Sequence, residues 1–373
     1  MVHRRSLARS LILIIVFMGV RCAPAAAQDG RADTWVLENR SYFDPLAAEI
    51  HAPDVSAMVL GGSNSFPFVT EPGNRRVWTI SLGKEVPVFG REGRRTAGTE
   101  TCFPDIGPPQ AGCTSWGIWF AIDFHMMEDF KDDSSPIVDT DYRFGGMFKL
   151  RHAFSNTRSL GLRGYYGHES THLGDEFSLA AQRNLASNDF QRINVSYQYW
   201  EYGVSYDLHY LNANGATHAF TIRHIGSILD PFTSWDSGYY STDPLEVNGH
   251  TVTPSTNRYE PAFEFEWRNE SLGLGDALNQ PAGTKVRTKW WRPYASVDLR
   301  YRTVYNYAKP DPDAGDDRQW STNLVAGYRR LRVESKRGEP DFFARVYYGV
   351  NPYGQLRSQS GFFLFGVGVH VFV

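Results

Sequence analysis

The chain has 373 residues, a formal net charge of −3 and a pI near 6.4. Such a balance provides no basic field to attract a phosphate backbone, which argues against nucleic acid as a partner. Aromatic residues make up 14% of the chain, yet its mean hydropathy is −0.41. That combination is typical of β-strands in which apolar and polar residues alternate and aromatic residues form girdles.

The first 27 residues have the three parts of a secretory signal peptide. Three arginines among the first nine residues precede an apolar core at 11–20, and three alanines follow at 25–27. The apolar core is shorter than the roughly 20 residues that a transmembrane helix needs. We therefore expect cleavage after Ala27 and export across the inner membrane of a Gram-negative cell. The outer membrane is the predicted location, with the periplasm as the alternative.

Two cysteines, Cys102 and Cys113, remain in the mature chain after cleavage of the predicted signal peptide removes Cys22. Arg21 stands before Cys22, where a lipoprotein site requires a small residue. An even number of cysteines in a compartment that permits disulfides predicts that the two pair. The segment between them is rich in Pro and Gly, so the bond is expected to staple a loop. No Cys or His at short spacing accompanies them, so they do not suggest a zinc site.

Apolar and polar residues alternate with a period of two along much of the mature chain, as half-buried strands require. A parallel α/β sheet is excluded, because its strands are apolar on both faces. The predicted fold is an all-β, antiparallel outer-membrane-type barrel of roughly 12 strands. A soluble periplasmic β-sandwich or barrel would show the same period and is the alternative. The clearest segments are 193–199, 204–209, 263–268, 295–302, 342–348 and 363–373.

The first two of these segments are joined by Glu201-Tyr202-Gly203, which predicts a hairpin. The last segment ends the chain, as the closing strand of outer-membrane barrels usually does. Residues 28–75 show no clean alternation and are predicted to form an N-terminal irregular arm or plug, which leaves 76–373 for the barrel.

The polar face of the predicted strands carries charges of both signs. A lumen of this kind is expected to fill itself with ion pairs, which favours a narrow or plugged barrel over a wide, open porin. The charged residues are Asp207, Glu264, Glu266, Asp298, Arg300, Arg302 and Arg345.

One segment, His168–Glu176, concentrates side chains that could perform chemistry. His168, Glu169 and His172 spell the H-E-x-x-H string, which on a helix would bind zinc with the glutamate as general base. Glycines surround the string and the residues before it follow a strand pattern. We therefore predict no metal site here.

Nucleophilic hydrolysis is the second interpretation of this segment. On a strand, His168, Ser170 and His172 would face the same side, where a histidine could activate the serine and Asp175 or Glu176 could orient the imidazole. Outer-membrane lipid hydrolases place His and Ser on a barrel strand in this general way. However, counting strands backwards from a periplasmic C-terminus places His168 toward the periplasm, whereas such hydrolases act on the outer leaflet. The third interpretation is structural, with the polar side chains capping a turn.

Four segments together resemble a bacterial family known only as domain of unknown function 1207. The resemblance covers most of the mature chain and implies a Gram-negative envelope protein, without supplying an established reaction. The segments are Tyr42–Leu46, His168 and Ser170 with His172–Glu176, Arg192–Tyr197, and Arg345–Gly349.

The sequence thus predicts an outer-membrane β-barrel of unassigned biochemical function, with a candidate site at His168–Glu176. The alternatives are a Ser/His hydrolase of envelope lipid or lipopolysaccharide, and a channel or accessory protein for envelope export. Outer-membrane lipid and the barrel-assembly machinery are the expected partners, together with a small-molecule or lipid substrate of unknown identity. The sequence has no dinucleotide loop and no phosphate-cradling loop, so no cofactor is predicted.

Overall fold

The computed structural model describes the strands, several turns and one short luminal segment of the chain. The predicted signal peptide and part of the predicted N-terminal arm lie outside the described residues. Described are 32–36, 47–49, 55–62, 75–93, 102–103, 109–129, 137–174, 195–211, 217–229, 245–247, 250–252, 259–270, 291–303, 318–330, 340–353 and 361–371.

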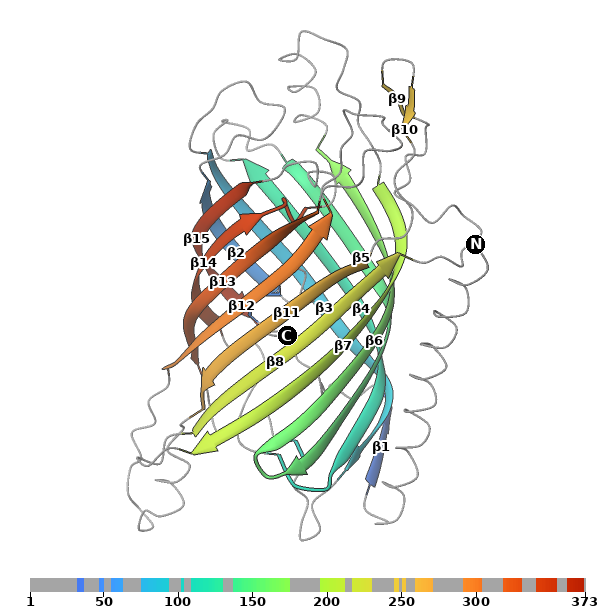
Figure 1. Cartoon of the computed structure of the whole chain (residues 1–373), viewed down its shortest axis with the longest axis vertical. Helices are drawn as coiled ribbons and strands as arrows, with labels where there is room; N and C mark the ends of the chain where they lie inside the picture. Colours follow the sequence, from blue (N-terminus) through green and yellow to red (C-terminus); the bar gives the residue numbers. More distant parts are fainter. Residues whose placement is uncertain are drawn as a thin grey trace.

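Twelve antiparallel strands close into a barrel (Figure 1), which confirms the predicted fold class and strand number. Each strand pairs with its neighbour, and β15 returns to pair with β2, so the sheet forms a complete cylinder. The strands are β2 (Val55–Gly62), β3 (Arg75–Gly93), β4 (Thr114–Asp129), β5 (Ile137–Ser155), β6 (Arg158–Leu173), β7 (Val195–Leu211), β8 (Thr217–Leu229), β11 (Tyr259–Asn269), β12 (Trp291–Thr303), β13 (Arg318–Arg330), β14 (Pro340–Gly349) and β15 (Phe362–Val371).

Three further short strands accompany the barrel. β1 (Ala32–Val36) pairs with the far end of β3, beyond the part of β3 that pairs with β2. β9 (Leu245–Val247) and β10 (His250–Val252) pair with each other in a small separate sheet above the upper rim in Figure 1. The part of the chain that the structure describes contains no helix with the length and apolar character needed to span a bilayer.

The two shortest connections of the barrel lie at the same end. Because neighbouring strands are antiparallel, β5, β7 and β15 all finish at this end, which we call the C-terminal end. It has the short connections 156–157 and 212–216 as well as the longer 94–113 and 270–290, whereas the longest connection, 230–258, joins strands at the opposite end together with 174–194. Short turns on the periplasmic side and longer loops outside are typical of outer-membrane barrels.

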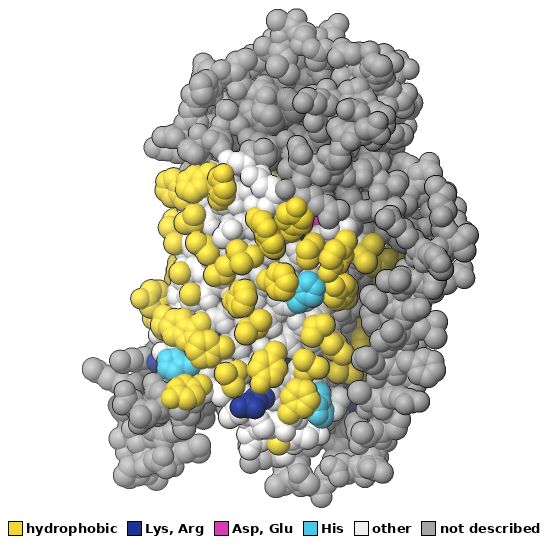
Figure 2. Space-filling view, viewed as in Figure 1, with side chains coloured by type: hydrophobic (Ala, Val, Ile, Leu, Met, Phe, Trp, Pro, Cys, Tyr) yellow, Lys and Arg dark blue, Asp and Glu magenta, His cyan; other side chains and the backbone are white. Residues whose placement is uncertain are grey.

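The outer wall is apolar because every second residue of each strand points outward. Phe263 and Phe265 are both 41% exposed, while Glu264 between them is fully buried. The same alternation holds along β12, β14 and β15, as their sequences predict. Figure 2 shows the result on the visible face, where hydrophobic side chains form a broad band around the barrel.

The inside of the barrel combines a charged region with a hydrophobic cluster. The cluster includes Ala47 and Ala48, which precede the barrel in sequence, and Met58 of β2. Apolar Met58 therefore points inward while its neighbours Ala57 and Val59 are exposed outside. This breaks the expected alternation and explains why β2 was not recognised in the sequence. The barrel begins at Val55 rather than at residue 76.

β7 corrects a second expectation, since the predicted hairpin at Glu201-Tyr202-Gly203 does not exist. One continuous strand runs from Val195 to Leu211, and these three residues lie in its middle. Tyr199 faces the lumen and is 5% exposed, whereas Val204 faces outward and is 39% exposed. Because the luminal residue Tyr199 is aromatic, the apolar positions before Glu201 are odd-numbered, whereas those after Gly203, such as Val204, are even-numbered. The alternation in the sequence therefore shifts by one residue although the strand contains no turn.

The predicted disulfide is present, because Cys102 and Cys113 are bonded in the connection between β3 and β4. Their Cα atoms are 5.8 Å apart. Cys102 packs with Phe103 and Ala153 in a small buried cluster at the C-terminal end of the barrel. The bond thus staples a loop, as expected.

Candidate functional site

The predicted serine and histidine meet on the outer wall of β6. Even-numbered residues of this strand point outward, so Ser170 and His172 are neighbours on one face, both partly exposed. Ser170 Oγ lies 3.0 Å from His172 Nε2, within hydrogen-bonding distance. The ring of Tyr142 on β5 forms a T-shaped contact with the imidazole, with ring centroids 5.9 Å apart. A hydroxyl and a base are therefore in the contact that nucleophilic activation needs.

His168 shares the outer face, as predicted, but its described contacts lead away from Ser170. Its Nδ1 lies 3.4 Å from Gln198 Nε2 on β7. Its ring packs against Phe144 on β5, with centroids 5.0 Å apart. Of the two histidines, His172 is thus the one in contact with the serine.

Glu169 has the opposite orientation and is a luminal residue. It is 5% exposed, and its Oε2 lies 3.3 Å from Arg143 Nε. On a strand the two imidazoles of H-E-x-x-H are also about 13 Å apart along the chain. The one-sided arrangement that the zinc protease string requires is therefore not formed. Among the described residues, no group of three or more His, Cys, Asp or Glu could hold a metal ion.

The remaining residues of the segment divide between the lumen and the part of the chain outside the described residues. Thr171 is fully buried on the luminal side of β6. The two carboxylates proposed to orient the imidazole, Asp175 and Glu176, lie outside the described residues, which resume at Val195 after Gly174.

The segment lies at the end of the barrel opposite to the C-terminal end, contrary to the strand count made from the sequence. β6 runs antiparallel to β5 and β7 and finishes at the end that has the connections 174–194 and 230–258. The sequence count failed because the predicted hairpin at Glu201-Tyr202-Gly203 is a single strand, so the count from the C-terminus contained one strand too many. If the C-terminal end faces the periplasm, Ser170 and His172 belong to the outer leaflet side.

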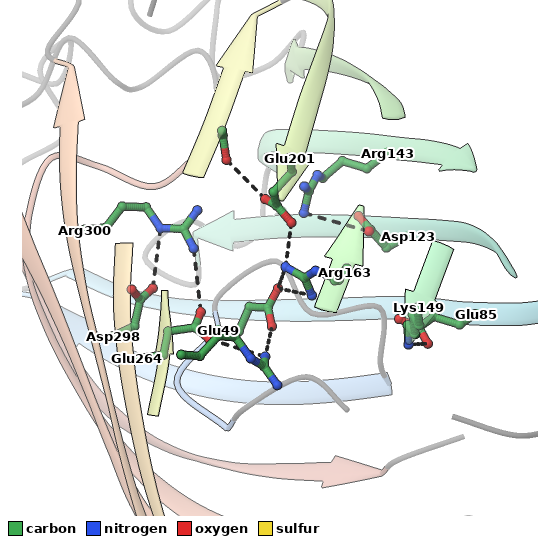
Figure 3. Close-up of polar contacts among 12 residues, drawn as sticks. Glu49, Glu85, Asp123, Arg143, Lys149, Arg163, Glu201, Glu264, Asp298 and Arg300 are labelled. Atoms are coloured by element: carbon green, nitrogen blue, oxygen red, sulfur yellow. Dashed lines mark hydrogen bonds and ion pairs between the residues drawn. The ribbon is translucent and has the colours of Figure 1, made fainter. Parts of the chain in front are cut away.

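A second polar constellation lies inside the barrel around Glu49 (Figure 3). The sequence predicted ion pairs among luminal charges that include Glu264, Asp298 and Arg300, but it did not single out Glu49. Glu49 Oε1 is 3.3 Å from both terminal nitrogens of Arg163 on β6. Its Oε2 is 3.4 Å from Arg223 Nη1 on β8. One carboxylate thus joins β6 and β8, which lie on either side of β7 in the wall.

The wall of the barrel supplies its own acids to the same arginines. Glu201 on β7 lies 2.5 Å from Arg163, and Glu264 on β11 lies 3.3 Å from Arg223. Arg300 on β12 continues the network, as its side chain is 3.8 Å from Glu264 and 3.6 Å from Asp298. Figure 3 shows these side chains pointing toward one another across the interior. Further ion pairs join Arg143 to Asp123 and Lys149 to Glu85.

The main chain around Glu49 is also held by the wall. The amide of Ala47 donates to Glu266 Oε2 at 2.8 Å, and that of Ala48 donates to Ser296 Oγ at 3.2 Å. The side-chain amide of Asn323 donates to the Ala48 carbonyl oxygen at 2.5 Å. We call Ala47–Glu49 the luminal segment.

Electrostatics favour the charged form of Glu49. Burial alone would raise the pKa of its carboxyl, but Arg163, Arg223 and Arg300 together lower that pKa below its ordinary value of 4.5. The carboxylate is therefore ionised at neutral pH and able to form charge-assisted hydrogen bonds. The only sequence signal for this role was indirect, namely the luminal charges of both signs.

Comparisons with known proteins find similar barrels at low sequence identity. Outer membrane phospholipase A from Escherichia coli, as an active-site mutant, is 12% identical with a TM-score of 0.42, covering 89% of this chain and 94% of that one. The β domain of the Bordetella autotransporter BrkA is 10% identical with a TM-score of 0.37, covering 86% and 99%.

Sequence comparison finds the thermostable neutral protease NprT of Geobacillus stearothermophilus, which is 24% identical over 277 residues, or 69% of this chain. The chain spans only 44% of that protease. No family model matches the sequence. The resemblance to the envelope family therefore stays a prediction from its motifs.

Proposed function

We propose that this protein is an integral outer-membrane β-barrel that its own luminal segment holds closed, and that it is not an open porin. The location is supported by the apolar outer band, in which Ile222 is 51% and Val367 is 65% exposed. Isolated side chains of this size on a water-exposed wall are ordinary, but a band around a closed cylinder suits hydrocarbon. The proposed resemblance to the envelope family agrees with this location.

The observation that carries the closed state is the position of Glu49 between Arg163 and Arg223. Their three side chains are each at most 8% exposed, and the contacts of the luminal segment reach from Arg163 on β6 to Asn323 on β13, well around the barrel from β6. Removing one partner of a buried ion pair is strongly unfavourable, because it leaves an uncompensated charge. The segment therefore stays in the lumen at neutral pH.

Two measurements on the refolded full chain test this proposal. Heat-modifiable migration on a gel and fractionation with outer membranes would show the membrane-inserted barrel. In planar bilayers we expect wild type to show little conductance, and Glu49→Ala to conduct more. Recovery in the soluble periplasm, or a wide and steady pore in wild type, would contradict the proposal.

A second function, hydrolysis of ester bonds in envelope lipid, is favoured by the 3.0 Å contact between Ser170 Oγ and His172 Nε2. Ser170 would attack the ester carbonyl carbon while His172 accepts the hydroxyl proton. The histidine would then pass that proton to the departing alcohol, and water would release the acyl group from the serine. The outward position of the pair gives it direct access to lipid.

The hydrolase proposal is tested by covalent labelling and by product analysis. We expect a fluorophosphonate probe to label Ser170 in wild type and not in Ser170→Ala or His172→Gln. Fatty acid release from phospholipid vesicles should fall in parallel. Tyr166→Phe, on the same outer face of β6, is the matched control and should keep both signals. Equal labelling of wild type and Ser170→Ala would rule out this function.

A further inference from the structure

The luminal segment is held as a ligand would be, with every described polar contact supplied by the barrel wall. Six strands take part in the described contacts. The residues are Arg163 on β6, Arg223 on β8, Glu266 on β11, Ser296 on β12, Asn323 on β13 and Arg345 on β14. These contacts bind both the main chain of the two alanines and the side-chain carboxylate of Glu49. Recognition of main chain together with one charged side chain is how proteins bind short peptides.

The barrel wall also provides acidic side chains that pair with the two arginines. Arg163 is held by Glu201 and Arg223 is held by Glu264, so each guanidinium has a wall partner besides Glu49. Glu264 is fully buried and Glu201 is 8% exposed. The two arginines are thus oriented by the wall whether or not Glu49 is present. Preorganised donors of this kind lower the entropy cost of binding.

The luminal segment adds a single carboxylate to the network. The wall contributes three arginines, Arg163, Arg223 and Arg300, and three acids, Glu201, Glu264 and Asp298, which leaves no excess positive charge for a more highly charged group. The preference for one carboxylate therefore comes from the direct contacts of Arg163 and Arg223 with Glu49. A phosphate group would bring up to two negative charges beside three buried acids, which the same geometry disfavours.

We infer that the barrel lumen contains a binding site for short acidic peptides, in which Ala47-Ala48-Glu49 occupies the place of the ligand. The site takes two small residues followed by a glutamate or aspartate, since both alanines are buried among luminal side chains and the acid reaches the two arginines. This inference rests on the proposed closed barrel. An external peptide of this kind would displace the luminal segment and open the lumen.

The test measures binding of a labelled peptide to the full chain refolded in detergent micelles. The probe is fluorescent Ala-Ala-Glu with an amidated C-terminus, and the matched control is Ala-Ala-Gln with the same label. In Glu49→Ala, the internal carboxylate is gone, and we expect saturable binding of Ala-Ala-Glu by fluorescence anisotropy. Ala-Ala-Gln should bind about ten-fold more weakly or worse, because it lacks the charge, and ten-fold corresponds to ~1.4 kcal/mol. Wild type, with its site self-occupied, should bind the probe more weakly than the variant.

A second variant keeps the test decisive if Glu49→Ala does not refold. Ala48→Pro removes the amide that donates to Ser296 and leaves the wall unchanged. It should also bind Ala-Ala-Glu better than wild type does. Absence of binding to both variants, or equal binding of the Glu and Gln peptides, would overturn the peptide site. The closed state is judged separately by conductance, so a silent wild-type bilayer with no peptide binding refutes only the site.

Discussion

The outer and inner faces of the barrel satisfy their polar groups in different ways. On the outer wall, His224 of β8 contacts only nearby strands: its Nδ1 lies 3.0 Å from the Ala262 carbonyl oxygen, and its Nε2 lies 3.1 Å from the Tyr202 hydroxyl. Inside, Glu49 reaches Arg223 from 174 positions earlier in the sequence. The outer contacts of His224 therefore follow from strand register, whereas the contact between Glu49 and Arg223 comes from a segment outside the sheet, which no strand register specifies.

Replacing a buried luminal acid should have the largest effect on stability. Glu264→Ala leaves Arg223 and Arg300 beside an empty position, and we expect a loss of about 3–5 kcal/mol in the free energy of unfolding. Urea titration monitored by tryptophan fluorescence measures it. The control is the neighbouring outward residue, where Phe263→Leu should cost less than about 1.5 kcal/mol. Equal losses would show that the two faces do not differ as described.

A charge on the outer wall should be the next most damaging change. Ile222, which is 51% exposed near the middle of β8, would face hydrocarbon. Ile222→Arg should cost about 2–4 kcal/mol in lipid vesicles, as arginines near the bilayer midplane do. Ile222→Leu serves as the control and should be nearly neutral. An arginine variant as stable as wild type in vesicles would indicate a water-facing wall.

Acid should release the luminal segment. Because the folded-state pKa of Glu49 lies below 4.5, its stabilising contribution is complete above that ordinary value and is lost as pH falls through the lowered pKa. We expect conductance in planar bilayers to stay low at neutral pH and to rise only below about pH 4.5. Glu49→Gln should conduct at every pH. A wild-type pore that opens near neutral pH would contradict this assignment.

The smallest effect is expected where an outer polar network loses one hydroxyl. Tyr259 Oη lies 2.6 Å from Tyr202 Oη and 3.2 Å from His224 Nε2. Tyr259→Phe should cost about 1 kcal/mol, the usual net value of a hydrogen bond. Tyr206→Phe is the control, because the Tyr206 hydroxyl has no hydrogen-bond partner among the described residues. If both variants lose the same stability, the network does not stabilise the wall.

Prediction of the candidate site was correct where it depended only on strand geometry. Placing His168, Ser170 and His172 on one face needed no more than a period of two, and the structure confirms it. Prediction failed where it required the number of strands between the segment and the C-terminus, since the single strand β7 had been predicted as two. The prediction of the barrel end at which Ser170 lies was therefore wrong.

The sequence by itself determined the closed antiparallel barrel, the apolar and charged faces of most strands, and the pairing of Cys102 with Cys113. These follow from local periodicity and composition, which survive without knowledge of distant contacts. Only the tertiary structure decided that Tyr199 faces inward, that Ser170 lies away from the C-terminal end, and that Glu49 lies inside the barrel against two arginines. The physical reason is that closure brings together residues more than a hundred positions apart, and nothing in a local pattern specifies which arginine a distant carboxylate will meet.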